Sequence, residues 1–402
     1  NQIVGNSSRE RGGGLYHASD ALVEDNLVKD NTSDWAGGGV YIYQHAGTVR
    51  GNQIIGNQSV NDGGGIYFYQ GHPVMVDNTV RGNHSGDDGG GVRFFESFGR
   101  MEGNLVEDNH ADHDGGGARL SHKPCQIADN IVRNNTAGGS GGGFDLDNDA
   151  SVLTGGVTSG NTAASYGGGI HMVLGPWNDG GISGMRIENN HAHRGGGIAL
   201  QDNYQPLTFR DLTVVGNTAD HGGGLHSRTT VFTLTGSVFA GNQASIDGGA
   251  LWMGQAQPFP DACPCPATHT SATIGFVTAW GNSAPEGSVL WSDTPDVQTF
   301  QDSIFHGNTG TTSVRIAAAT ASNTPAAPVW RYNDTLPATF GGMTAPGSGN
   351  GNLAVNPQLV DAAGGDFHLG AASPCINAGD PAVQDADASR ADMGRYGGPV
   401  AP

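Results

Sequence analysis

The stretch IIGNQSVNDGGGIYFYQGHPVMVDNT, residues 54–79, is followed at once by a second copy of the same template, VRGNHSGDDGGGVRFFESFGRMEGNL, residues 80–105. Each copy has a β-branched residue three positions before an asparagine and a glycine triplet six positions after it. The triplet recurs every 25 to 28 residues, starting at Gly12, Gly37, Gly63, Gly89, Gly115, Gly141, Gly167, Gly195 and Gly222. Internal repetition of this length indicates a solenoid, in which each repeat forms one coil.

The residues behind each triplet alternate with period two, which is the pattern of a β-strand. The first position is apolar in every copy, as in Val40 and Ile66, and the third is mostly apolar, as in Ile42 and Phe68. One coil cannot bury such a face alone, but stacked coils can, with equivalent residues about 4.8 Å apart. The repeat therefore predicts an all-β fold, a right-handed single-stranded parallel β-helix of about 12 coils.

Stacking of the coils gives the recurring asparagines and glycines a structural role. Asparagine amides aligned in a column can hydrogen-bond to one another and to backbone groups at a turn. The predicted ladder consists of Asn31, Asn57, Asn83, Asn109, Asn135, Asn161, Asn217 and Asn242. Glycine triplets suit a tight turn or a place where a side chain would clash.

The pairing of a GGGIY-type element with IxxN resembles the GGA(I/L/V) and FxxN repeats of polymorphic outer-membrane-protein passengers. More broadly, it is similar to bacterial secreted β-helix repeat proteins. Strict versions occur at Phe239/Asn242 and at Gly248-Gly249-Ala250, and the resemblance covers roughly residues 1–310. It implies a right-handed parallel β-helix exported to the outside or the outer surface of a bacterial cell.

The fading of the repeat predicts two regions. Residues 1–308 are expected to form the β-helix, with an insertion at 254–270, and residues 309–402 irregular terminal coils and a loop-rich C-terminal cap. The cap is expected to cover the open edge of the last coil, which would otherwise invite pairing. Because Asn1 lies inside a coil, a second copy could dock there head to tail and propagate as a filament.

The overall charge restricts the partners. The formal net charge is −20, with only two lysines, whereas nucleic acids and anionic membranes require a basic surface. No run of 18 apolar residues is present, so no membrane-spanning helix is expected. One or two disulfides are compatible with an extracellular protein, and four reduced thiols in the cytosol are the alternative. The cysteines are Cys125, Cys263, Cys265 and Cys375.

The outward positions of the first coils are rich in aromatic residues. The outer aromatic patch comprises Tyr16, Tyr41, Tyr43, Tyr67, Tyr69 and Phe95, with Arg93 beside it. An exposed patch of this kind is typical of a surface that contacts a glycan or a protein. The alternative is cross-strand stacking that only stiffens the sheet.

Middle coils place charged residues at the same outward positions. Asp145, Asp147, His171 and Arg119 are the candidate catalytic residues, because glycoside hydrolysis needs two carboxylates with different roles. A polysaccharide lyase needs a base and a group that neutralises charge. Solvated charges on an exposed sheet are the alternative interpretation.

A column of aspartates precedes the triplets. Like charges stacked at coil spacing repel one another unless a cation or solvent screens them, so Asp62, Asp88 and Asp114 are a possible Ca²⁺ site. Hydrated turn aspartates are the alternative, and the histidines of the same turns, such as His110 and His113, are interpreted as polar turn residues.

These patterns favour an extracellular or cell-surface structural or adhesive protein without a cofactor, whose partner is itself or a surface glycan or protein. The alternative function is a polysaccharide-active enzyme, lyase or glycoside hydrolase, or a glycan-binding module, acting on the exposed sheet face.

Overall fold

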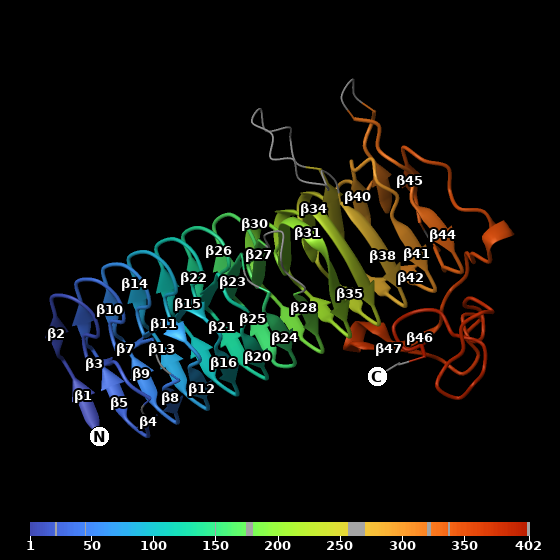
Figure 1. Ribbon diagram of the computed structural model, residues 1–402. Coiled ribbons are helices and arrows are strands. Elements are labelled where there is room, and N and C mark those ends of the chain that lie inside the picture. The colour runs from blue at the N-terminus through green and yellow to red at the C-terminus, as the bar shows by residue number, and fades with distance from the viewer. Residues whose placement is uncertain are drawn as a thin grey trace. The chain divides into compact units, whose positions relative to one another are not determined.

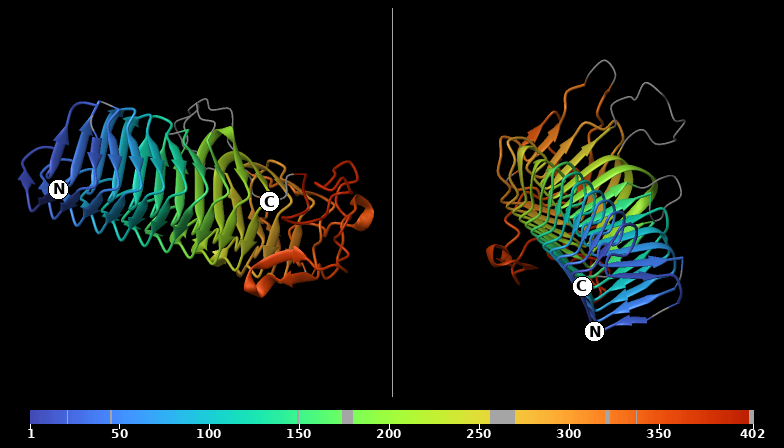
Figure 2. Two further views of the ribbon diagram at one scale, coloured as in Figure 1. Left: turned by 90° about the horizontal axis from the view of Figure 1, so that it is seen from below. Right: turned by 90° about the vertical axis from the view of Figure 1, so that its left-hand side faces the viewer.

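The computed structural model describes residues 1–20, 22–44, 46–148, 150–173, 180–255, 270–319, 323–336 and 338–399. Short β-strands make up almost all of its regular structure. Within each unit, equivalent strands of successive coils lie side by side (Figure 1, Figure 2). The chain divides into two compact units, residues 1–200 and 201–402.

In the first unit, each coil contributes strands to three parallel sheets. The first sheet contains β1 (Gln2–Val4), β5 (Leu27–Lys29), β9 (Gln53–Ile55), β13 (Thr79–Arg81), β17 (Leu105–Glu107), β21 (Ile131–Arg133), β25 (Val157–Ser159) and β29 (Arg186–Glu188). The second contains β2 (Ser7–Ser8), β6 (Thr32–Ser33), β10 (Gln58–Ser59), β14 (His84–Ser85), β18 (His110–Ala111), β22 (Thr136–Ala137), β26 (Thr162–Ala163) and β30 (His191–Arg194).

The third sheet receives two strands from each coil. The strands behind the triplets are β3 (Leu15–His17), β7 (Val40–Tyr43), β11 (Ile66–Gly71), β15 (Val92–Ser97), β19 (Ala118–Ser121), β23 (Phe144–Asp147) and β27 (Ile170–Val173). Their successors are β4 (Leu22–Glu24), β8 (Thr48–Arg50), β12 (Val74–Val76), β16 (Arg100–Glu102), β20 (Gln126–Ala128), β24 (Val152–Thr154) and β28 (Gly181–Ser183).

The strands of successive coils pair in parallel and in register. Val80 in β13 pairs with Ile54 in β9 on one side and with Val106 in β17 on the other. The two apolar columns behind the triplets point inward, and Ile66 and Phe68 in β11 have no exposed surface. The predicted stacking of residues 26 apart is confirmed by this register.

The asparagine ladder is confirmed as well. In the first unit, each amide Nδ2 donates to the Oδ1 of the next member over 2.9 to 3.0 Å, from Asn6 through Asn31, Asn57, Asn83, Asn109, Asn135 and Asn161 to Asn190. In the second unit, Asn217, Asn242, Asn282 and Asn308 continue in the same way over 2.9 to 3.0 Å. Asn57 and its neighbours are fully buried, so the ladder is an internal feature of the coils.

A second asparagine ladder, which we did not predict, runs beside the first. It consists of Asn26, Asn52, Asn78, Asn104 and Asn130. Each of these residues lies five positions before a member of the first ladder, so the same 26-residue spacing in the sequence would have revealed it.

The glycine triplets fulfil both predicted roles. The first glycine of every triplet has a left-handed backbone, with φ between 63° and 70°, so it makes a tight turn. The second approaches the next coil closely: a Cβ on Gly64 would lie 2.4 Å from the backbone oxygen of His84. This turn folds the segment before the triplet back over the strand behind it.

β31 (Ile198–Arg210) begins at the end of the first unit, and the second unit continues with the same three kinds of strand. They are β32 (Thr213–Val215), β33 (Thr218–His221), β34 (Leu225–Thr235), β35 (Val238–Ala240), β36 (Gln243–Asp247), β37 (Leu251–Gly254), β38 (Ser271–Gly275), β39 (Thr278–Trp280), β40 (Leu290–Ser292), β41 (Thr299–Gln301) and β42 (Ile304–His306).

Regular strands persist beyond the predicted boundary at residue 308. They are β43 (Val314–Ile316), β44 (Val329–Arg331) and β45 (Phe340–Gly341), and each pairs in parallel with a strand of an earlier coil. The insertion predicted at 254–270 falls between β37 and β38, and its residues 256–269, with Cys263 and Cys265, lie outside the described residues. Cys125 and Cys375 are buried, and the prediction of disulfides stays a prediction.

The C-terminal segment packs against the side of several coils, and its predicted cover of the open edge of the last coil stays a prediction. It contains two short 3₁₀ turns, η1 (Ser348–Asn350) and η2 (Ala362–Gly364), and the antiparallel pair β46 (Leu359–Asp361) and β47 (Asp366–Leu369). Phe367 is buried against Val238 and Ala240, which are the outward positions of β35, and against Trp280 of β39. The segment therefore covers the side of these coils, because their outward apolar residues need a cover.

The chain is thus an all-β, right-handed parallel β-solenoid of about 12 turns with almost no helix, as the repeat predicts. Among the described residues, no helix has both the length and the apolar character needed to cross a membrane.

Candidate functional site

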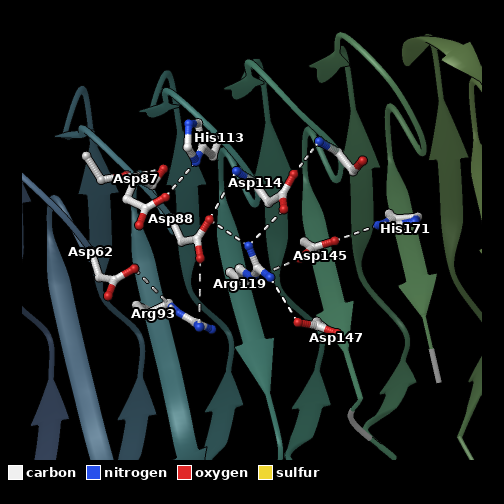
Figure 3. A network of polar contacts seen from close by, with 12 residues as sticks. Asp62, Asp87, Asp88, Arg93, His113, Asp114, Arg119, Asp145, Asp147 and His171 are labelled. Atoms are coloured by element: carbon white, nitrogen blue, oxygen red, sulfur yellow. Dashed lines mark hydrogen bonds and ion pairs between the residues drawn. The ribbon is translucent and has the colours of Figure 1, made fainter. Parts of the chain in front are cut away.

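The predicted catalytic residues lie side by side on the sheet formed by β19, β23 and β27. Parallel pairing aligns Arg119 with Asp145 and Asp145 with His171, one residue per coil. Asp147 follows Asp145 by two positions and therefore points to the same face of β23. The predicted proximity of these four residues is confirmed (Figure 3).

Arg119 is the centre of this cluster. Its Nη1 atom lies 2.6 Å from Asp88 Oδ1 and 2.8 Å from Asp114 Oδ2, and its Nη2 atom lies 2.9 Å from Asp147 Oδ2. Its Nε atom lies 3.1 Å from Asp145 Oδ2. One guanidinium thus binds carboxylates from three successive coils. Although burial lowers the pKa of Arg119, the carboxylates, led by Asp145, outweigh it and raise that pKa.

Asp145 is the most enclosed member. Its side chain is only 2% exposed, and His171 Nδ1 lies 2.6 Å from its Oδ1 atom. Its Oδ1 atom thus has a hydrogen-bonding neighbour, and its Oδ2 atom lies within ion-pair distance of Arg119 Nε without a hydrogen bond. Asp147 is more accessible, with 37% of its side chain exposed. A substrate could reach one carboxylate of the predicted pair, whereas hydrolysis requires both.

The aspartates of the possible Ca²⁺ site alternate with arginines. Arg93, whose side chain is 4% exposed, lies between Asp62 and Asp88, at 3.8 and 3.9 Å. Arg119 then lies between Asp88 and Asp114, so positive side chains separate the stacked negative ones (Figure 3). Burial raises the pKa of Asp62 to about 6 and also raises the pKa of Asp88.

This alternation differs from the predicted column of hydrated aspartates. The carboxylates are held in a network, and Arg93 and Arg119 supply the positive charge that stacked aspartates require. Binding of Ca²⁺ at Asp62, Asp88 and Asp114 stays a prediction.

The outer aromatic patch is not the exposed platform that we predicted. Tyr41 and Tyr67 are 2% and 6% exposed, and Arg93 beside them is 3% exposed, whereas Tyr16 is 47% exposed. The turn before the triplet covers this column, since Ala36 packs against Tyr41 and Tyr67. Tyr43, Tyr69 and Phe95, two positions further along their strands, are partly buried against the same cluster.

The rings of the patch stack on one another from coil to coil. Tyr41 and Tyr67 have centroids 5.1 Å apart and planes 5° from parallel, and Tyr43 and Tyr69 are 5.5 Å apart at 2°. Phe95 continues the second column, 5.8 Å from Tyr69. Parallel stacking uses the ring faces, so a bound sugar would meet ring edges instead of the faces on which it stacks. The alternative of cross-strand stacking accounts for the patch.

The second unit contains a comparable column that we did not predict. His226, Trp252 and Trp291 stack with centroid separations of 4.2 and 4.9 Å. A pocket of about 130 Å³ also lies in this unit, lined by residues that include Arg210, Phe276 and Arg395. Pockets that hold drug-sized ligands are about 300–1,000 Å³, so this one is too small for an oligosaccharide.

The comparisons with known proteins agree with the fold and go no further. A sequence model of the family described as "Right handed beta helix region" matches residues 15–178. No curated protein matches the chain.

Proposed function

We propose that the chain is a structural β-helix of an extracellular or cell-surface assembly, and that the Arg119 cluster holds coils together instead of performing a reaction. The observation that carries this proposal is the enclosure of Asp145, which is 2% exposed between Arg119 and His171. A catalytic carboxylate must reach its substrate, and this one is occupied by the protein itself.

The contacts of Arg119 support the structural role. They join Asp88 on the turn before β15, Asp114 on the turn before β19, and Asp145 and Asp147 on β23. A buried ion network whose partners come from different coils fixes their register, because removing one partner leaves the others uncompensated. The stacked aromatic columns act in the same way with apolar contacts.

A surface glycan or a protein is the expected partner, and the exterior of a bacterial cell the expected location, by analogy with secreted β-helix repeats. The fold is equally that of polysaccharide-active enzymes, so an assay must distinguish the two functions.

The test uses the full chain on a panel of acidic and neutral polysaccharides, with formation of new reducing ends or double bonds as the readout. We expect no turnover. Asp145→Asn should lower the free energy of unfolding by about 1–3 kcal/mol, because it weakens a buried charged hydrogen bond. Asp34→Asn, at an exposed position, is the matched control and should change it little.

Turnover that is lost in Asp145→Asn or Asp147→Asn, in protein that remains folded, would overturn the structural proposal. Binding of a polysaccharide without turnover would support an adhesive function. In that case, Tyr69→Ala, in the partly buried aromatic column, tests whether the glycan meets the edges of the rings.

A further inference from the structure

A histidine pair on adjacent coils shares no residue with the Arg119 cluster. His84 in β14 pairs in register with His110 in β18, so the two imidazoles lie one above the other. Their ring centroids are 5.2 Å apart and their planes are tilted by 30°. Parallel stacking at coil spacing therefore brings two nitrogen ligands to the same place on the outside of the second sheet.

A carboxylate from Asp112, the residue that follows β18, joins this pair. Ala111 points inward and is fully buried, so its neighbours His110 and Asp112 both point outward. Asp112 Oδ1 lies 2.9 Å from Nε2 of His84 and 3.0 Å from Nε2 of His110.

We propose that His84, His110 and Asp112 form a binding site for a divalent transition-metal ion of the Zn²⁺ class, which bridges two coils. The three ligand atoms lie within 4.8 Å of one another. Zn²⁺ binds histidine nitrogen at about 2.0–2.1 Å and carboxylate oxygen at about 2.0–2.2 Å, so small side-chain rotations replace the present hydrogen bonds by metal bonds. Water would complete the coordination.

The accessibility of these side chains permits that rearrangement. The side chains of His84, His110 and Asp112 are 41%, 45% and 49% exposed, so an ion can reach them and they can turn. Two imidazoles and one carboxylate select Zn²⁺, Ni²⁺ or Cu²⁺ over Ca²⁺, which requires six or more oxygen ligands.

A neighbouring cluster provides an internal comparison. Asp87, Asp88 and His113 also have ligand atoms within 4.8 Å of one another. However, Asp88 lies 2.6 Å from the guanidinium of Arg119, and the positive charge of that group repels a metal ion. The ion pairs of Asp112 in the described part of the chain are both with histidines, so the two sites differ in the charge that surrounds them.

The experiment is a calorimetric titration of the full chain, without a histidine tag, with ZnCl₂ and then with CaCl₂. Absorption of bound Co²⁺ in the visible range reports the coordination directly. We expect one Zn²⁺ per chain at the tightest site, no Ca²⁺ at this site, and a higher melting temperature in Zn²⁺, because the ion binds the folded state. His84→Gln, His110→Gln and Asp112→Asn should each weaken binding by about 10–100-fold or more.

The control is His72→Gln, an exposed histidine of the same unit that lies outside the cluster, and its Zn²⁺ affinity should equal that of the unsubstituted chain. Circular dichroism of each variant without metal checks that it is folded. A triple variant combines His84→Gln, His110→Gln and Asp112→Asn. If the unsubstituted chain does not bind Zn²⁺, or if the triple variant binds Zn²⁺ as tightly as the unsubstituted chain, the proposed site does not exist. Either result would leave the structural role of the Arg119 cluster intact, since the two clusters share no residue.

Discussion

Asn57 is a buried polar residue whose side-chain oxygen and amide are both hydrogen-bonded. Its Oδ1 accepts from the backbone nitrogen and the side-chain amide of Asn31, at 3.0 and 2.9 Å. Its own amide donates to the backbone oxygen of Val28 and to Asn83 Oδ1, each at 3.0 Å. Each ladder residue therefore satisfies groups in the coil before it and in the coil after it, which is why a buried amide recurs at this position.

Replacing one such residue should be strongly destabilising. Asn57→Ala removes these four hydrogen bonds, so the buried backbone nitrogen and side-chain amide of Asn31 lose an acceptor and the backbone oxygen of Val28 loses a donor. Asn83 Oδ1 keeps the backbone nitrogen of residue 57, at 2.9 Å. Each unsatisfied buried group costs about 1–3 kcal/mol, so we expect a loss of about 3 kcal/mol or more in the free energy of unfolding. Chemical denaturation followed by circular dichroism measures it.

The adjacent residue supplies the comparison for that measurement. Gln58→Ala changes an exposed residue at the start of β10 and should alter the free energy of unfolding by less than about 0.5 kcal/mol. Equal effects of the two substitutions would mean that the ladder does not stabilise the coils.

At the scale of the element, the triplet turn and its strand form one unit. The turn needs glycine for two separate reasons, a left-handed backbone at its first position and close contact with the next coil at its second. At Gly64 the contact dominates, because a Cβ would lie 2.4 Å from His84 O and 2.5 Å from Gly90 O.

Two alanine substitutions separate these reasons. Gly82→Ala places a side chain on a left-handed backbone, with φ 61° but nothing within 4 Å, and should cost about 1 kcal/mol. Gly64→Ala forces backbone atoms of two coils apart, so it should cost several times more or prevent folding. Thermal unfolding and the yield of soluble protein compare the two variants. A Gly64→Ala protein as stable as the Gly82→Ala protein would contradict the close contact.

The same turn explains how far the sequence could predict the structure. Period two and the 26-residue spacing are local and repeated, so they predicted the strands, the register and the ladder through Asn57, Asn83 and Asn109. They also predicted that Arg119, Asp145 and His171 lie together. Exposure could not be predicted in this way, because it depends on what covers an outward position. Tyr67 points outward and is nevertheless buried, since the triplet folds the preceding turn over it.

The C-terminal segment could not be predicted for a related reason. Phe367 and Tyr396 belong to no repeat, and the surface that they cover, Val238 and Ala240, shows no special signal in the strand pattern. The histidine pair, by contrast, had a signal, since His84 and His110 are 26 residues apart. Taken singly, each histidine is typical of a turn residue, and only the 26-residue spacing indicates that the two lie together.

At the scale of the whole molecule, the chain has a net charge of −20, and several of its aspartates are partly or wholly removed from water. Burial raises the pKa of Asp62, Asp88, Asp293, Asp302, Asp334, Asp385 and Asp392. For Asp62, Asp302 and Asp385 the pKa rises from 3.8 to about 6. The pKa is lowered for Asp112, Asp366 and Asp387, whose carboxylates are exposed or nearly exposed. These three groups change the pH dependence of stability only below the ordinary aspartate pKa.

These shifts predict an unusual dependence of stability on pH. A carboxyl whose folded pKa is raised binds its proton more tightly in the folded state, so its contribution is present below the unfolded pKa and is lost as pH rises through the folded pKa. Between pH 3.8 and about 6 the folded chain binds more protons than the unfolded chain, and the melting temperature should fall by a few degrees as pH rises across this window.

Asp62→Asn, which stays neutral, should flatten the dependence of the melting temperature on pH, whereas Asp34→Asn should not. Repeating the melts at high salt separates this effect from long-range repulsion, because salt screens exposed charges far more than buried ones. A melting temperature that rises steadily between pH 4 and pH 7 would show that these aspartates are not buried in the native coils.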